Sequence, residues 1–362
     1  MKKGICLCLA VLFTVLLFSG CAPELYERIL ISAIGVDRTD AGYRITARAA
    51  KAQEDGAESC LSGEGRTVPE ALNQLAFSTG QKPLYSHNTL VIFGMDCAQD
   101  GLNGCVDFFI RHYDSRPTVK VFLSETTAED ILTQEGGAEL ASAQIADLSK
   151  SAAYSGLSVD VNIIDLINGT YSEGVFASLP ILNMEEEIRL NGTAILDDFR
   201  LRCMLSPEET RGLLALRGEL KAGETVVSDP EGETVSITVR DADCAIRFTG
   251  DAESPRFEVA LQIEGEISSL SGGQRRLDNE AFPRLERALA ARITENITAY
   301  LSTAVFESGC DAVGFGDIVR RDAPEIWREI SESWSQRLPE TVFDLHVSAA
   351  IARVEEEDTP YL

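Results

Sequence analysis

Residues 29–37 read Ile29-Leu30-Ile31-Ser32-Ala33-Ile34-Gly35-Val36-Asp37, a stretch rich in β-branched side chains that ends at a turn. The next stretch, Tyr43 to Ala50, alternates between its two faces in the manner of a partner strand. The simplest interpretation of the two stretches is a β-hairpin. This hairpin would open the first structured block of the chain.

A helix is expected after the hairpin, because Thr67 can cap it and Pro69 suits its first turn. Leu72, Leu75 and Ala76 then repeat at helical spacing. Further along, the pattern predicts strands at residues 90–93 and 119–123 and helices at residues 102–111 and 127–132. Because strands and helices alternate, an α/β or α+β domain is favoured over an all-helical one.

The second block has its own local signals. Ser206-Pro207-Glu208-Glu209 is a capping box that opens a helix to about Leu216. Alternating strands are expected at residues 235–239 and 257–263, and a last strand at residues 343–351. A long amphipathic helix is predicted from near Pro283 to near Ser308, because leucine, isoleucine and valine recur four apart.

The chain has 362 residues, which is more than one typical domain. We place the main boundary at the acidic run Glu185-Glu186-Glu187. The expected organisation is an N-terminal α/β domain at 21–185, a C-terminal domain at 186–355 that divides further near 225–250, and an acidic tail at 356–362. The predicted fold class is therefore α+β: several domains in which mixed sheets pack against helices, with the long helix in the C-terminal domain.

The first twenty residues have the order of a secretory signal: Lys2 and Lys3, an apolar run from Ile5 to Phe18, then Ser19 and Gly20. The apolar run is shorter than the roughly 20 residues of a spanning helix. Leu17 to Cys21 resembles the bacterial lipobox, so residues 1–20 are predicted to be a cleaved lipoprotein signal peptide and Cys21 the site of lipid attachment. An ordinary signal peptide cut nearby, or an uncleaved anchor, is the alternative.

The charge of the chain limits its partners. The sequence contains 32 basic and 58 acidic residues, and removal of residues 1–20 would take away two lysines and no acid, leaving a net charge of −28. Such a body is repelled by nucleic acid and by anionic lipid headgroups. We therefore expect no nucleic-acid partner, and we expect the lipid on Cys21 to hold the protein on the membrane.

Nine cysteines are present, of which two would leave with the signal and Cys21 would carry the lipid. Export permits disulfides, but spacing alone establishes none, even for the near pair Cys97 and Cys105. No CxxC or Cys/His grouping suggests zinc. The six remaining cysteines are Cys60, Cys97, Cys105, Cys203, Cys244 and Cys310.

A search for catalytic motifs returns nothing specific. Leu270 to Gln274 spells the signature of ABC-transporter ATPases, but the chain has no phosphate loop to work opposite it, so we interpret this stretch as a polar connection. The three histidines, His87, His112 and His346, are far apart. No enzyme activity, cofactor or metal is predicted.

Some polar pairs are interpreted as turns. Asp241 and Asp243 lack the loop spacing of a calcium site and are expected in a solvated turn. Asn168-Gly169 and Asn191-Gly192 open glycosylation-like sequons, but Asn-Gly is also a strong turn signal.

Several motifs along nearly the whole chain together resemble one family, the Ger(x)C lipoproteins, which are the C subunits of bacterial spore germinant receptors. In order along the chain they are the opening strand that ends in Gly35-Val36-Asp37, Gly63-Glu64-Gly65-Arg66-Thr67, His87 to Gly94, Phe108 to Val119 with Arg116-Pro117, Asn191 to Leu196, Leu205 to Gly212, and the stretch from Trp327 to Trp334.

The resemblance implies a lipid-anchored, non-catalytic subunit on the outer face of the spore inner membrane, required for germination in response to nutrients. Its implied partners are the integral-membrane A and B type receptor subunits. Two other classes are weighed beside it. An extracytoplasmic solute-binding lipoprotein would have two similar α/β lobes around a cleft, and a cell-envelope hydrolase would need a nucleophile or metal cluster that the linear sequence does not display.

Overall fold

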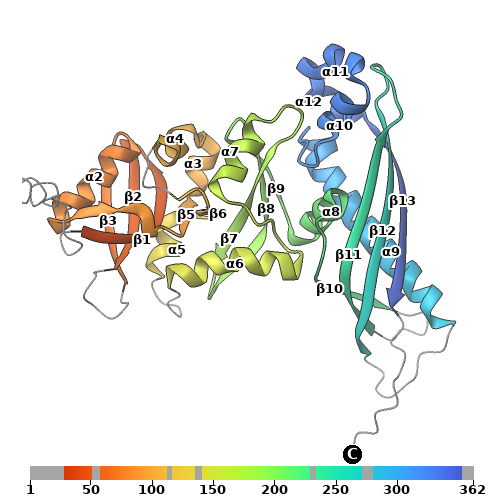
Figure 1. Cartoon of the computed structure of the whole chain (residues 1–362), viewed down its shortest axis with the longest axis horizontal. Helices are drawn as coiled ribbons and strands as arrows, with labels where there is room; N and C mark the ends of the chain where they lie inside the picture. Colours follow the sequence, from red (N-terminus) through yellow and green to blue (C-terminus); the bar gives the residue numbers. More distant parts are fainter. Residues whose placement is uncertain are drawn as a thin grey trace, which may run out of the picture.

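The computed structural model describes residues 28–50, 58–111, 116–134, 141–228, 234–270 and 280–352. Figure 1 shows two sheets at opposite ends of an elongated molecule, with helices packed on each. The predicted signal peptide, Cys21, His112 and the acidic tail lie outside the described residues. The predicted α+β class, with mixed sheets packed against helices, is confirmed.

The larger sheet has nine strands. Its centre is parallel, because β1, β5, β6 and β7 run in one direction, and both margins are antiparallel. The predicted hairpin is confirmed: β1 and β2 pair with Val36 opposite Ile45. The path is β3 (Glu58–Gly65), β2 (Gly42–Ala50), β1 (Arg28–Thr39), β5 (Leu90–Phe93), β6 (Lys120–Ser124), β7 (Ala177–Met184), β8 (Ile188–Asp197) and β9 (Arg200–Leu205), with β4 (Lys82–Leu84) beside β1 and leading into the short η2 (Tyr85–His87).

Helices cover both faces of this sheet (Figure 1). On one face lie α2 (Val68–Thr79), α3 (Met95–Asp100), α4 (Asn103–Arg111) and α7 (Ile163–Tyr171), whose buried side chains belong to the main hydrophobic core. On the other lie α5 (Ala128–Thr133) and α6 (Ser142–Ser155), which bury a second, smaller core with Leu90, Ile92 and Phe122.

The smaller sheet has the order β10 (Glu224–Ser228), β11 (Thr234–Phe248), β12 (Arg256–Leu270) and β13 (Val342–Ala352). Because β12 and β13 are parallel, the chain must cross between them, and the crossing is helical. The predicted long helix is α9 (Ala281–Tyr300), which continues into the π-helix η3 (Leu301–Glu307). The crossing ends with α10 (Phe315–Asp322), α11 (Pro324–Ile330), η4 (Ser331–Ser333), α12 (Trp334–Arg337) and η5 (Leu338–Glu340).

The two sheets share the main core. Helix α8 (Pro207–Arg217) follows β9 and packs directly against α9, so it lies where the larger sheet meets the C-terminal elements. The boundary that the sequence suggested at 185/186 falls between β7 and β8, which are neighbouring strands of one sheet. The change from one sheet to the other comes between Leu205 and Glu224. The division into 21–185 and 186–355 stays a prediction.

The three turn interpretations are wrong. Asp241 and Asp243 lie within β11, where both are exposed and the intervening Ala242 is buried. Asn168-Gly169 lies within α7, which starts at the Asn162 capping box and packs Gly169 close to β7. Asn191-Gly192 lies within β8, and Gly192 has a φ of 86° where the strand passes Leu205. In each case tertiary packing overrides a local turn signal.

Candidate functional site

The histidines singled out in the sequence do not lie together in one site. His87 lies in η2 beside the larger sheet and His346 in β13 of the smaller one, and both are exposed. Among the described residues no group of three or more His, Cys, Asp or Glu side chains could hold a metal ion. In the same ranges, no helix has the length and apolar character to cross a bilayer. The sites of interest are instead buried polar clusters and one exposed sheet face.

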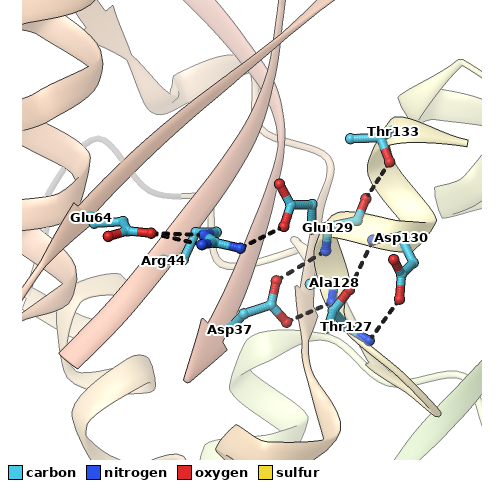
Figure 2. Close-up of polar contacts among 8 residues, drawn as sticks. All are labelled: Asp37, Arg44, Glu64, Thr127, Ala128, Glu129, Asp130 and Thr133. Atoms are coloured by element: carbon cyan, nitrogen blue, oxygen red, sulfur yellow. Dashed lines mark hydrogen bonds and ion pairs between the residues drawn. The ribbon is translucent and has the colours of Figure 1, made fainter. Parts of the chain in front are cut away.

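The first cluster is built on Asp37, at the end of β1 (Figure 2). Its carboxylate accepts hydrogen bonds from the backbone N–H groups of Ala128, at 2.6 Å, and Glu129, at 3.0 Å, in the first turn of α5. Thr127 and Asp130 complete the capping of the same helix by a reciprocal capping box. Asp37 therefore joins the central strand to α5 through the helix N-terminus.

Two glycines make room for this contact. A Cβ at Gly35 would lie 2.9 Å from the Cβ of Ala128, and a Cβ at Gly94 would lie on the Asp37 carboxylate. Burial raises the pKa of Asp37, while the two N–H groups act in the opposite direction. Both of these donors to the carboxylate are backbone N–H groups at a helix end, so the chemistry of this cluster is capping and positioning.

Arg44 extends the cluster along β2 (Figure 2). Its Nη2 is 2.8 Å from the Glu64 carboxylate on β3, and its Nη1 is 2.9 Å from the Glu129 carboxylate on α5. The hydrogen bonds to Glu64 and then to Glu129 raise the pKa of Arg44. The side chain is 40% exposed, so each ion pair contributes modestly to stability. The three residues tie the outer strands to the same helix that Asp37 caps.

A second buried carboxylate, Asp311, organises the C-terminal helices. One of its oxygens accepts from the N–H groups of Gly314 and Phe315, and the other from the N–H of Gly316, at 2.7 Å, and from the indole Nε1 of Trp334, at 2.9 Å. Burial raises the pKa of Asp311 against the effect of these four donors. The carboxylate thus fixes the start of α10 against the tryptophan of α12.

Two arginines of α8 hold the sheets together. Arg217 donates from Nε to the Ala312 carbonyl oxygen at 2.9 Å and from Nη2 to Ser178 on β7 at 2.8 Å. Arg211 donates to the Thr225 hydroxyl at 2.6 Å and to the carbonyl oxygens of Ser155 and Glu224 at 3.3 Å. Burial lowers the pKa of Arg211. Both guanidinium groups use carbonyl and hydroxyl acceptors, which makes them fixed links between elements distant in sequence.

The exposed face of the smaller sheet carries a shallow hollow of about 630 Å³. The hollow forms where two small side chains, Ala245 and Ala260, lie opposite each other in neighbouring strands. Polar side chains also line it. They include Asp243 on β11, Gln262 on β12, and His346 and Ser348 on β13. This face is suited to contact with a polar partner surface rather than to enclosing a small molecule.

The motifs behind the family resemblance are used in packing. Gly63 and Gly65 lie against α2, where a Cβ on either would come within 2.5 Å of the Ala71 backbone. Thr67 caps the same helix, and Ser206 forms the predicted capping box of α8. Sequence reasoning found these caps but missed the roles of Asp37, Asp311 and Arg211. The one available signal for Asp311 was the Gly314-Phe315-Gly316 stretch that follows it.

Comparisons with known proteins agree with this architecture. Residues 22–184 match the family model described as the spore germination protein N-terminal domain, and residues 191–355 match the one described as spore germination B3/GerAC like, C-terminal. The crystal structure of the GerBC protein superposes with a TM-score of 0.62 at 17% identity, covering 88% of this chain and 97% of that one.

Curated relatives extend over the same length. The chain is 24% identical to spore germination protein KC of Bacillus subtilis (strain 168), over 99% of this chain and 98% of the relative. It is 22% identical to spore germination protein A3 of the same organism, over 88% and 89% of the two chains. The chain therefore belongs to the Ger(x)C family of spore germination proteins, as the resemblance predicted.

Proposed function

We propose that this protein is a lipid-anchored, non-catalytic subunit of a nutrient germinant receptor in the spore inner membrane. The observation that carries the proposal is the match of both family models, in order, along nearly the whole chain. Membership of the family supports a role in spore germination. The anchor at Cys21 and the membrane-embedded A and B type partners are the finer parts of the proposal.

The use of the family motifs supports a non-catalytic role. Asp37, Gly63, Gly65 and Thr67 act in helix capping and close packing. An exported body that is built by such contacts and presents a polar sheet face is suited to binding other proteins. We infer that the exposed face of β11, β12 and β13 is available for this purpose.

The solute-binding alternative receives less support. That class would have two similar α/β lobes, whereas here a mixed nine-stranded sheet accompanies a four-stranded sheet of different topology. Calorimetry on the purified full chain with candidate nutrients would revive this alternative if it revealed tight binding of a small molecule.

The proposal is tested by purifying the tagged protein from spore inner membranes in mild detergent, followed by mass spectrometry. We expect an N-terminal peptide that begins with a diacylated Cys21, together with two multi-span receptor subunits. Recovery of transporter permeases in their place would contradict the receptor assignment. A matched strain carrying the same tag on an unrelated spore lipoprotein identifies proteins that follow any lipid-anchored bait.

A further inference from the structure

The smaller sheet has two edges of different length. One edge is β10, which has five residues, and the other is β13, which has eleven and lies at the outer margin of the sheet in Figure 1. Strand β13 pairs with β12 over its whole length without a register shift, so it carries no β-bulge. A long, regular strand at the margin of a sheet presents a row of main-chain groups that can pair with another strand.

The hydrogen bonds of β13 show which of its main-chain groups point away from the sheet. The N–H of Val342 donates to the Pro255 carbonyl oxygen at 3.1 Å, and alternate residues of a parallel strand bond to the same neighbour. The even-numbered residues of β13 therefore bond to β12, and the odd-numbered ones point their N–H and C=O groups outward. The N–H of Ile351 agrees with this, because it donates to the Glu286 carboxylate on α9 at 3.2 Å.

Four successive outward-pointing residues form what we name the open edge of β13: Phe343, Leu345, Val347 and Ala349. Within the described residues, their N–H and C=O groups have no hydrogen-bond partner. The strand contains no lysine, arginine or proline, and its one acidic side chain, Asp344, is held by Arg256 at 2.9 Å. Edge strands usually carry free charges, prolines or bulges that prevent pairing with another strand. The open edge has none of these protections.

Apolar side chains flank the open edge on the side of the helices. The side chains of its four residues point toward this side, where they are half-buried against the main core. Phe306 of η3 is 42% exposed, and its ring centroid lies 6.0 Å from that of Phe343. A strand added at the open edge would cover part of this apolar surface, which favours its binding.

The opposite face of the sheet is acidic. Four exposed carboxylates on β11 and β12 form no ion pair with any described residue: Asp241, Asp243, Glu258 and Glu264. The strands β11, β12 and β13 contain three arginines and no lysine. Arg240 and Arg256 are already paired, with Glu266 and Asp344, so Arg247 is the one that remains to offset the four carboxylates.

We propose that the open edge of β13 receives an extended segment of a receptor partner, which adds a strand to the four-stranded sheet. This proposal rests on the proposed function, which supplies the partner. The segment would alternate apolar side chains, placed beside Phe306 and Phe343, with basic side chains over the acidic face. A second copy of this chain fits less well, because each copy carries 26 more acidic than basic residues and its β13 has no basic side chain except His346.

Two neighbouring alanines provide a matched test. The N–H of Ala349 points to the open edge and that of Ala350 to β12, so proline removes a free donor at one position and a bonded donor at the other. The tagged full chain is purified from spore inner membranes in mild detergent, and the A and B type subunits recovered with it are quantified.

We expect Ala349→Pro to lower the recovery of one receptor subunit about tenfold, because a main-chain hydrogen bond of the added strand is lost and the proline ring obstructs pairing. Its thermal unfolding should stay close to that of the wild-type protein, and Ala349→Ser, which keeps the N–H, should recover the subunit normally. Ala350→Pro should unfold at a clearly lower temperature, because it breaks the ladder to β12.

A cross-linking measurement identifies the occupant without a proline. We expect p-benzoylphenylalanine in place of Ser348, whose side chain is exposed beside the open edge, to cross-link on irradiation to one stretch of a receptor subunit. Mass spectrometry should find alternating apolar and basic residues in that stretch. The same replacement of Asp40, in the exposed hairpin turn of the larger sheet, is the control and should not link to it.

Equal recovery of the receptor subunits with the wild-type protein and with Ala349→Pro would overturn the proposal and leave the proposed function intact. A cross-link from position 348 to a second copy of this chain, or to no protein, would overturn it as well. Equal destabilisation by the two prolines would show that the Ala349 N–H is already bonded, which contradicts the open edge itself. Recovery of no receptor subunit with the wild-type protein contradicts the proposed function, so the two failures are distinguished.

Discussion

Asp37 shows how one side chain sets the position of a helix. It ends the first long strand, and its carboxylate replaces the missing partners of the first N–H groups of α5. We predict that Asp37→Ala lowers the free energy of unfolding by about 1–2 kcal/mol, the usual range for a lost helix cap. Urea unfolding followed by circular dichroism measures this change. Asp40→Ala, in the exposed hairpin turn, is the matched control and should change stability little.

Glu58 makes a contribution to the stability of the protein that depends on pH. Its carboxylate accepts from the N–H and hydroxyl of Ser142, at 3.0 and 2.8 Å, and lies 3.5 Å from the buried Arg48 guanidinium. Burial alone would raise the pKa of Glu58, but hydrogen bonds from Ser32 and Ser142 and the charge of Arg48 outweigh it and lower the pKa.

The sign of the pH effect follows from this lowered pKa. The unfolded chain takes up a proton at Glu58 before the folded protein does, so the contribution is present above the ordinary glutamate pKa and is lost as the pH falls through the folded-state pKa. Glu58→Gln should cost about 3 kcal/mol at pH 7, since it removes a charge partner of a buried arginine, and less at pH 3. Equal costs at both pH values would contradict the assignment. Glu64→Gln is the control at pH 7, because the Glu64 side chain is 59% exposed and its ion pair with Arg44 should contribute well under the cost expected for Glu58→Gln.

At the scale of elements, the crossing of α8 and α9 depends on one small residue. A Cβ at Gly212 would lie 2.2 Å from the Asn296 carbonyl oxygen, which is too close for any side chain. We predict that Gly212→Ala forces the helices apart and costs about 2–3 kcal/mol. Gly80→Ala provides the comparison, because its Cβ meets open space and only the left-handed backbone, at a φ of 68°, is strained. That change should cost about 1 kcal/mol. Thermal unfolding of the two variants distinguishes crowding from strain.

Elements with local signals could be predicted from the sequence. The caps at Thr67 and Ser206, the hairpin and the long helix all depend on residues a few positions apart, and all four are found. The buried polar clusters could not be predicted, because their partners are distant: Asp37 and Ala128 are 91 positions apart, and Arg48 and Leu132 are 84 apart. An isolated aspartate or arginine in a strand gives no sign of a partner on a later helix.

At the scale of the whole molecule, the net negative charge of the chain opposes its attachment to the membrane. The chain carries 26 more acidic than basic residues, so its body is repelled by an anionic membrane surface. Attachment must then come from the proposed lipid or from partners. Two acyl chains, at about 0.8 kcal/mol per buried CH₂, hold a protein stably, and this term does not depend on salt. Washing with salt therefore leaves attachment by the lipid in place, and detergent releases it.

We predict that the wild-type protein remains on membranes washed with 1 M salt and moves into detergent micelles when detergent is added. A variant in which residues 1–21 are replaced by an ordinary cleavable secretory signal should appear in the soluble extracytoplasmic fraction of cells that lack the A and B type subunits. Persistence of this variant on salt-washed membranes of those cells would contradict the lipid anchor. If the receptor subunits are restored, partial return of the variant to the membrane would measure how much of the attachment the protein partners supply on their own.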